Sequence, residues 1–382
     1  MTKLSSRITA VAVLVFMAYF MLITVFGNKE ARSADENRVL AERPSFSLSS
    51  LTDGGAALDI SAYVTDHFPL RSKWIKLNTA VRSELGEGMV NGVYISDDML
   101  LDASASKRQT AAESARYINS FASAYNGALY IAAIPTSSGV YREKLPEYLD
   151  DYRESQQITD LYDRLSGGIK RIDAYNILRM LNGNYIYYRN DTKWTSYGAY
   201  CVYRTVIQKL GFLPTSYDKY SVRHVSSDFR GNLYNRSLYS GTDPDILDFY
   251  YYPSGADVET CTGYYNSGKS VEKQIYDAGQ LDSDYKYNAY LGEEVPLVKI
   301  KTTVNNERRL LVIKDGYADC FIPFLIQHYS EIDVVSPELM TGKITDYVDL
   351  SDYEQTLILF GIEDLSRKGI LSSIDISEGG QS

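Results

Sequence analysis

Residues 309–335, RLLVIKDGYADCFIPFLIQHYSEIDVV, carry the pattern that decides the fold class. Their hydrophobicity predicts a buried strand at 309–313, a helix at 317–329 that Pro323 makes irregular, and a second strand at 332–335. Strands that alternate with helices are typical of a parallel sheet with helices on both faces. The stretch therefore predicts an α/β fold.

The same alternation continues elsewhere in the chain. Further strands are predicted at 128–134, 169–172, 185–188 and 356–360, and further helices at 107–125, 156–165 and 195–210. The helix at 195–210 should begin at an N-cap, Thr195, and end at Gly211. Residues 60–85 have apolar positions mostly at helical spacing and predict one or two packing helices. Between residues 212 and 306 this period fades, and β-favouring, tyrosine-rich segments predict an antiparallel excursion from the α/β core.

The composition excludes several classes of protein. The chain has 382 residues, a formal net charge of -10, and lysines and arginines that are scattered rather than clustered. Binding to nucleic acid through phosphate contacts is therefore not expected. The three cysteines form no C-x-x-C pair. Asp243, Asp245 and Asp248 do not match a calcium loop and are interpreted as residues of a turn and a solvated face. We expect no metal and no cofactor.

An uncharged run at residues 8–26, ITAVAVLVFMAYFMLITVF, is long enough to cross a membrane as a helix. It is longer than the apolar region of a cleaved signal peptide, and no small-x-small site follows it, so we expect an uncleaved anchor. Positive charges lie on both sides and do not orient the helix. Because large domains translocate largely regardless of flanking charge, we expect a single-pass cell-membrane protein with an extracytoplasmic domain; a cytoplasmic domain is the alternative.

These observations give a predicted domain organisation. It consists of a cytoplasmic tail and transmembrane anchor at 1–28, a polar juxtamembrane stalk at 29–45, one folded domain at 46–367 that includes the excursion, and a polar tail at 368–382.

Two turns between a predicted strand and the following helix are candidates for a functional site. They are residues 187–200, YYRNDTKWTSYGAY, and residues 311–319, LVIKDGYAD. In an open parallel sheet, ligands bind at the carboxyl ends of the strands, where such turns converge. We therefore expect the two turns to meet.

The two turns resemble the signature of the DHHW proteins. In that family Asp-His-His-Trp-Thr-Ser-x-Gly-Ala-Tyr follows a strand and opens a helix, and a second turn reads Lys-Asp-Ser-Tyr-Ala-Asn. Weaker matches in the family's order are residues 36–46, 68–71, 91–94, 135–146 and 230–234. The resemblance implies an SGNH-hydrolase-like three-layer sandwich with a parallel central sheet. It also implies a relation to the extracytoplasmic O-acetyltransferases that modify alginate and other exported polysaccharides.

The resemblance further implies a Ser-His-Asp triad, in which histidine removes the serine proton and aspartate fixes the imidazole. Carried over by position, the aspartate is Asp191, the histidine is Lys193 and the serine is Gly316. Glycine has no side chain to acylate, and a lysine with an ordinary pKa of about 10.4 is protonated and cannot act as a base. We therefore expect a degenerate triad.

Further residues around this site are candidates for binding or for packing. Candidate substrate-binding residues in the two turns are Tyr188, Trp194, Asp315 and Tyr317. Backbone N–H groups at Gly316 could still hold an anion or a carbonyl, whereas a salt bridge between Asp191 and Lys193 is the structural alternative. His328 is expected to cap or pack a helix. The 34 tyrosines suit stacking on sugar rings, but β-rich segments favour tyrosine anyway.

Three functions remain open at this point. The first is a degenerate accessory or binding subunit of surface-polysaccharide acetylation, whose partners would be the polysaccharide and a multi-spanning membrane O-acyltransferase. The second is an active O-acetyltransferase or esterase with a displaced nucleophile. The third is a non-catalytic structural protein of the bacterial cell envelope.

Overall fold

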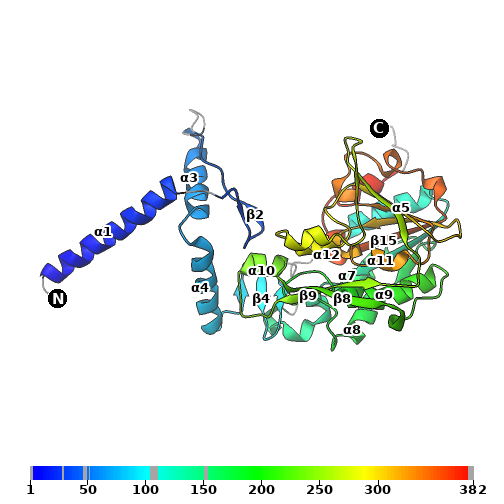
Figure 1. The fold of residues 1–382 in the computed structure, drawn as a ribbon, viewed down its shortest axis with the longest axis horizontal. Helices are drawn as coiled ribbons and strands as arrows, with labels where there is room; N and C mark the ends of the chain where they lie inside the picture. Colours follow the sequence, from blue (N-terminus) through cyan, green and yellow to red (C-terminus); the bar gives the residue numbers. More distant parts are fainter. Residues whose placement is uncertain are drawn as a thin grey trace. The chain divides into compact units, whose positions relative to one another are not determined.

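The computed structural model describes residues 3–27, 30–45, 50, 52–103, 111–149 and 154–376 (Figure 1). The chain divides into two compact units, Met1–Val90 with Tyr234–Gly241, and Asn91–Leu233 with Thr242–Ser382. This division differs from the single domain expected at 46–367, since the residues before Asn91 make most of their contacts among themselves and with 234–241.

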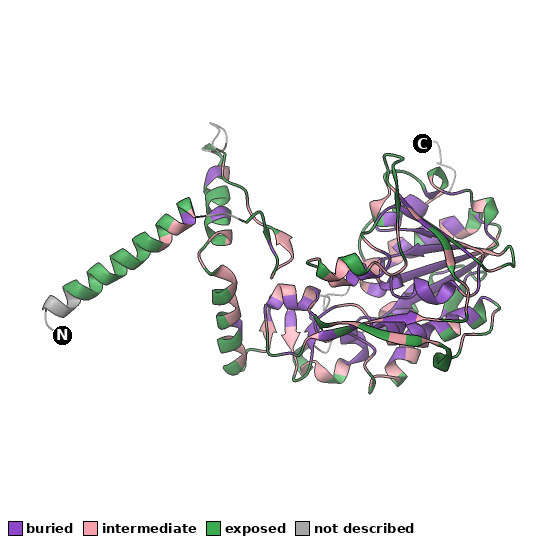
Figure 2. Cartoon of the chain, viewed as in Figure 1, coloured by how far each residue is buried: buried purple, intermediate pink, exposed green. Residues whose placement is uncertain are grey.

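The first unit contains the apolar N-terminal helix. Its elements are α1 (Lys3–Phe26), β1 (Arg32–Ser33), β2 (Arg38–Val39), α3 (Gly55–Asp66), α4 (Arg71–Glu84) and β3 (Met89–Val90). Within α1, Arg7–Phe26 is long and apolar enough to cross a membrane, and almost all of it is exposed (Figure 2). A membrane anchor and a signal sequence both have these properties.

The segment expected to be a polar stalk is folded. Its strands β1 and β2 pair antiparallel, and Arg38 forms an ion pair with Asp66 at the end of α3. The hydrogen bond from Arg38 lowers the pKa of Asp66 to about 2. Helices α3 and α4 occur where the apolar spacing predicted them. Ala56 and Tyr63 are their buried apolar residues, and Trp74 and Leu77 are among those that face outward.

The second unit is built on an eight-stranded sheet with the order β11-β10-β12-β14-β13-β15-β6-β7. Its strands are β6 (Ala128–Ile134), β7 (Lys170–Ile172), β10 (Val258–Tyr264), β11 (Ser270–Glu272), β12 (Leu297–Thr302), β13 (Arg309–Lys314), β14 (Glu331–Val335) and β15 (Gln355–Gly361). The run from β14 to β7 is parallel, and β11, β10 and β12 extend it antiparallel. The predicted antiparallel excursion supplies these three strands.

Helices cover both faces of the parallel part of the sheet. The helices of this unit are α5 (Ala112–Ala124), α6 (Ser137–Val140), α7 (Glu154–Asp163), α8 (Ala174–Met180), α9 (Ser196–Lys209), α11 (Ile322–Leu325) and α12 (Ile362–Leu365), and α10 (Asn232–Ser237) follows the hairpin strand β8. Alternate side chains of β6 enter two separate cores: Tyr130 packs with Val206 of α9, and Ile131 packs with Phe121 of α5. The predicted three-layer α/β architecture is therefore confirmed.

The predicted helix and hairpin signals are largely observed. Thr195 caps α9 by accepting a hydrogen bond from the Gly198 N–H, and the chain leaves the helix at Gly211 with φ +91. Strands β8 (Ser221–Phe229) and β9 (Asp245–Tyr251) form an antiparallel pair, while β4 (Val93–Ile95) and β5 (Leu100–Asp102) form a second one. Residues 107–110 of the predicted 107–125 helix lie outside the described residues.

Three predictions about local structure are wrong. Residues 185–188 form no strand beyond a single bridge between Tyr187 and Trp194. The helix expected at 317–329 is reduced to a 3-10 turn at Gly316–Ala318 and the short α11, with Pro323 in its first turn. The tail expected from residue 368 is packed as far as Ile374, because Leu371 and Ile374 are fully buried.

Candidate functional site

The two turns singled out in the sequence lie against each other in the second unit. The indole N–H of Trp194 donates a hydrogen bond to the carbonyl of Tyr317 at 2.7 Å, and the Tyr317 hydroxyl donates to the carbonyl of Thr192 at 2.8 Å. A Cβ atom added to Gly316 would lie 3.0 Å from Cε and 3.5 Å from Nζ of Lys193. Gly316 and Lys193 are therefore neighbours.

Asp191, in the first turn, is fully buried, and its carboxylate holds neighbouring segments in place. Its carboxylate accepts hydrogen bonds from the backbone N–H groups of Lys193 at 2.9 Å and Asn232 at 2.7 Å, and from the Tyr285 hydroxyl at 3.2 Å. A Cβ atom added to Gly231 would lie 1.9 Å from this carboxylate, so only glycine allows the approach. The carboxylate thus connects three segments that are distant in the sequence.

The salt bridge considered between Asp191 and Lys193 does not occur among the described side chains. The Asp191 carboxylate instead binds the Lys193 backbone, and the Lys193 ammonium lies 4.6 Å from the centre of the Tyr317 ring. Burial lowers the pKa of Lys193, but the charges of Asp315 and Asp364 outweigh it and raise the pKa above its ordinary value. Lys193 is therefore protonated and cannot accept a proton.

Asp315 occupies the beginning of the second turn. Its carboxylate accepts hydrogen bonds from the N–H groups of Tyr317 at 2.9 Å and Gly361 at 2.7 Å. Burial and the nearby charge of Asp364 raise its pKa well above the usual range. One donor that could have held an oxyanion is thus already used.

An ion cluster behind the second turn, with Lys314 and Asp319 buried and Glu294 exposed, was not predicted. Lys314 Nζ lies 2.6 Å from Asp319 Oδ1 and 3.2 Å from Glu294 Oε1. Burial raises the pKa of Asp319 to about 6, although Lys314 counteracts the effect. Lys314 and Asp319 lie in the second turn, on either side of Gly316, whereas no sequence pattern connects Glu294 with this turn.

A second carboxylate near the site titrates close to neutrality. Burial, together with the charges of Asp102 and Glu154, raises the pKa of Glu363 to about 7. Among the described residues, no group of three His, Cys, Asp or Glu side chains is arranged to hold a metal ion.

Two of the candidate substrate-binding residues are parts of the core. Tyr188 and Trp194 are fully buried; Tyr188 packs edge-on against Phe229, and Trp194 packs against Phe321. Tyr317 is also buried, and it contacts Lys193 with its ring. Asp315, which precedes Gly316, is also buried.

Two residues outside the turns were interpreted from the sequence, one wrongly. Asp245 is fully buried rather than solvated, and it fixes the first turn by accepting hydrogen bonds from the Tyr185 hydroxyl at 2.6 Å and the Asn190 N–H at 2.8 Å. His328 is a packing residue: its Nε2 lies 2.6 Å from the Tyr203 hydroxyl, and burial lowers its pKa to about 4.

Comparisons with known proteins agree with this architecture. A DHHW protein from Eubacterium siraeum has 22% identity, covers 75% of this chain and 95% of its own, and superposes with a TM-score of 0.63. Bacillus cereus PatB1, solved with a sulfonyl adduct, has 18% identity, covers 72% and 96%, and gives a TM-score of 0.62. The O-acetyltransferase domain of Pseudomonas putida AlgJ has 14% identity, covers 75% and 99%, and gives 0.44.

A search of curated protein sequences gives no match. The family model for DHHW proteins matches residues 77–335, which is more than half of the chain and includes both turns. The chain therefore belongs to the DHHW protein family.

Proposed function

We propose that this protein is a non-catalytic DHHW protein, anchored in the cell membrane by α1 with its folded part outside the cytoplasm. It acts as an accessory or binding subunit in the O-acetylation of a cell-surface polysaccharide. Its partners are the polysaccharide and a multi-spanning membrane O-acyltransferase. The observation that carries the proposal is the pair of neighbours Lys193 and Gly316, which offer neither a nucleophile nor a base.

Acyl transfer by the family's triad needs a hydroxyl that attacks the ester and a neutral imidazole that takes the hydroxyl proton. Gly316 has no hydroxyl. The Lys193 ammonium, whose pKa is raised, has no free electron pair to receive a proton. Its side chain also fills the space beside Gly316 in which a nucleophile would stand. The site therefore supports neither formation nor hydrolysis of an acyl-enzyme.

The nearby nucleophiles are poor replacements. The Cys320 thiol is buried, and burial raises its pKa to about 12, so it carries almost no thiolate at neutral pH. The Ser196 hydroxyl lies 2.9 Å from the Tyr290 hydroxyl and 3.0 Å from the carbonyl of Asp248, and has no histidine beside it. Thr195 donates its hydroxyl hydrogen to the carbonyl of Tyr185. An enzyme with a displaced nucleophile is thus less favoured by the geometry.

A sulfonyl fluoride probe tests whether any activated nucleophile exists. The full chain in detergent is incubated with the probe and analysed by intact mass spectrometry, with Bacillus cereus PatB1 as the positive control. We expect no stoichiometric adduct on this chain under conditions that label PatB1 completely. One adduct per chain on a single hydroxyl or thiol, absent after heat unfolding, would instead establish the enzyme alternative.

A further inference from the structure

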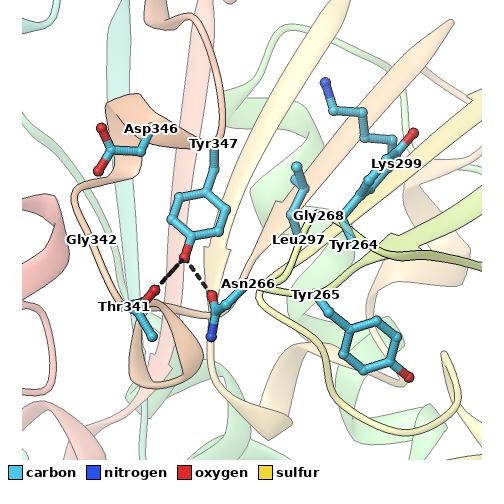
Figure 3. A pocket seen from close by; sticks show the side chains of 10 residues that line it. All are labelled: Tyr264, Tyr265, Asn266, Gly268, Leu297, Lys299, Thr341, Gly342, Asp346 and Tyr347. Carbon is cyan, nitrogen blue, oxygen red and sulfur yellow. Dashed lines mark hydrogen bonds between the residues drawn. The ribbon is translucent and has the colours of Figure 1, made fainter.

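A groove lies over the antiparallel part of the sheet in the second unit. It consists of two adjoining pockets of about 460 Å³ and about 250 Å³, and both are lined by Tyr264 and Lys299. Figure 3 shows the larger pocket, with Lys299 and Tyr264 on one side and Tyr347 on the other. Neither pocket is lined by Lys193 or Gly316.

The floor of the groove follows from the alternation of side chains along the strands. Thr262 of β10 is paired with Lys299 of β12, and Lys299 with Asp333 of β14, so that these three side chains lie in one row. The neighbouring residues Cys261 and Ile300 point to the opposite face and are buried in the core. This part of the sheet therefore has one apolar face and one polar face that forms the groove.

Several charged side chains of the groove are held in ion pairs, and the Asp346 carboxylate accepts a hydrogen bond from the Lys343 N–H at 2.8 Å. Lys299 Nζ lies 3.4 Å from Asp333 Oδ2, and Arg309 lies 3.0 Å from Glu331 and 3.4 Å from Asp352. A polyanion or a cationic ligand would have to compete with these internal pairs. The groove therefore suits an uncharged ligand that can accept and donate hydrogen bonds at its edges.

The rim of the larger pocket presents aromatic and amide groups on two connected loops. The Tyr347 hydroxyl donates a hydrogen bond to Asn266 Oδ1 at 2.5 Å and lies 3.5 Å from Thr341 Oγ1 (Figure 3). It also accepts a hydrogen bond from the Thr341 N–H at 3.1 Å. Asn266 Nδ2 in turn donates to the carbonyl of Leu339 at 2.9 Å. These bonds hold the two loops together before any ligand arrives, which reduces the entropy cost of binding.

The ring of Tyr265 is the exposed aromatic surface of this rim. It is 39% exposed and comes directly after β10, whereas Tyr264 and Tyr347 are half-buried. Aromatic rings stack on the apolar faces of sugar rings, and a tyrosine does so while its hydroxyl stays in water. Rings at the rim, hydrogen-bonding groups below them and paired charges on the floor form a set that fits a neutral sugar chain.

We propose that this groove binds an uncharged stretch of a polysaccharide, at a site separate from the triad-equivalent turns. The inference rests on the proposed function and gives it a ligand class: a neutral glycan several sugar units long, since two pockets adjoin. The groove holds the glycan, and another protein carries out the acyl transfer.

The test is isothermal titration calorimetry of the full chain in detergent. The probes are the neutral hexasaccharides cellohexaose, chitohexaose and xylohexaose, and the hexamer of galacturonic acid serves as the charged comparison. We expect at least one neutral probe to bind and the charged hexamer not to bind. Removal of the ring in Tyr265→Ala should weaken the affinity about tenfold, corresponding to about 1.4 kcal/mol, whereas Tyr265→Phe should keep most of it.

The matched control is Tyr148→Ala, which removes a tyrosine ring that is 73% exposed and lies outside the groove. It should leave the affinity unchanged. Binding of the neutral probe should also change less than about twofold between low and high salt, since no net charge is recognised.

Several outcomes overturn this inference. They are no binding by any neutral probe, a stronger affinity for the charged hexamer, or equal affinity in wild type and Tyr265→Ala. If binding is lost in Lys193→Met but kept in Tyr265→Ala, the glycan binds at the triad-equivalent turns; the groove is then wrong while the proposed function stands. Ester turnover by a chain that also binds the glycan in the groove would show that the proposed non-catalytic function is wrong while the groove inference stands.

Discussion

Replacing Gly231 with alanine is expected to lower the free energy of unfolding of the second unit by about 3 kcal/mol. The added Cβ would lie 1.9 Å from Oδ2 and 2.4 Å from Cβ of Asp191, which is much closer than van der Waals contact. The carboxylate cannot move aside freely, because hydrogen bonds from Lys193 and Asn232 fix it. Either the backbone shifts or these bonds break.

The change can be followed by fluorescence of the buried Trp194 during urea unfolding of the full chain, in a Trp74→Phe background so that a single indole reports. Gly167→Ala is the matched control, since its Cβ would have no neighbour within 4 Å. A smaller cost of Gly231→Ala in an Asp191→Ala background would locate the clash at the carboxylate. Equal midpoints for Gly231→Ala and wild type would show that the close approach does not exist.

Replacing Lys314 with methionine is expected to cost about 3 kcal/mol, because it leaves the buried Asp319 carboxylate without its cation, whereas the exposed Glu294 can be solvated by water. Lys314 is 4% exposed and lies within hydrogen-bond distance of Asp319 and Glu294. The same urea experiment measures the loss. As a control, Lys301→Met removes an exposed pair with Glu259 at 3.5 Å and should cost less than about 1 kcal/mol.

The Lys314→Met deficit should also depend on pH. Burial already holds the pKa of Asp319 at about 6, above its ordinary value of 3.8, and loss of the lysine should raise it further. A carboxyl whose pKa is raised by folding destabilises the native state as the pH rises through that pKa. The variant should therefore be closer to wild type at pH 4.5 than at pH 8. A deficit that is constant across this range would mean that Asp319 is not the group left uncompensated.

The fold could be predicted from the sequence wherever a local signal agreed with the final packing. Strand β6 has the predicted bounds because both of its faces are buried and Pro135 ends the apolar run. Helix α9 has the predicted start because the Thr195 cap is a local hydrogen bond. The strand predicted at 185–188 is wrong because the tyrosines of this segment bond to groups that are distant in the sequence rather than pairing in a sheet. The Tyr187 hydroxyl, for example, donates a hydrogen bond to the carbonyl of Pro135.

The candidate site was only partly predictable, because several of its contacts join residues that are distant in the sequence. The meeting of the two turns was expected from the family resemblance and from a strand before each turn, but only the second turn follows a strand, β13. The roles of the buried Asp245 and of Glu294 did not follow, since each contacts groups many residues away and has no motif of its own. The placement of Tyr188 and Trp194 in the core likewise depends on the packing of β8, β9 and the segment around Phe321.

The geometry also shows that Asp191 and Trp194 have structural roles. Asp191 connects the first turn to the backbone of Asn232, and Trp194 connects it to the backbone of Tyr317. Both residues therefore stabilise the fold whether or not a histidine and a serine stand beside them.

The account depends most on the inability of the Lys193 and Gly316 pair to attack an ester. Release of acetate from an aryl acetate and from an acetylated oligosaccharide measures this directly, with the full chain in detergent and its Lys193→Met variant compared at equal folded concentration. We predict that both proteins give the rate of buffer alone. Turnover by the wild-type chain that Lys193→Met abolishes would contradict the account.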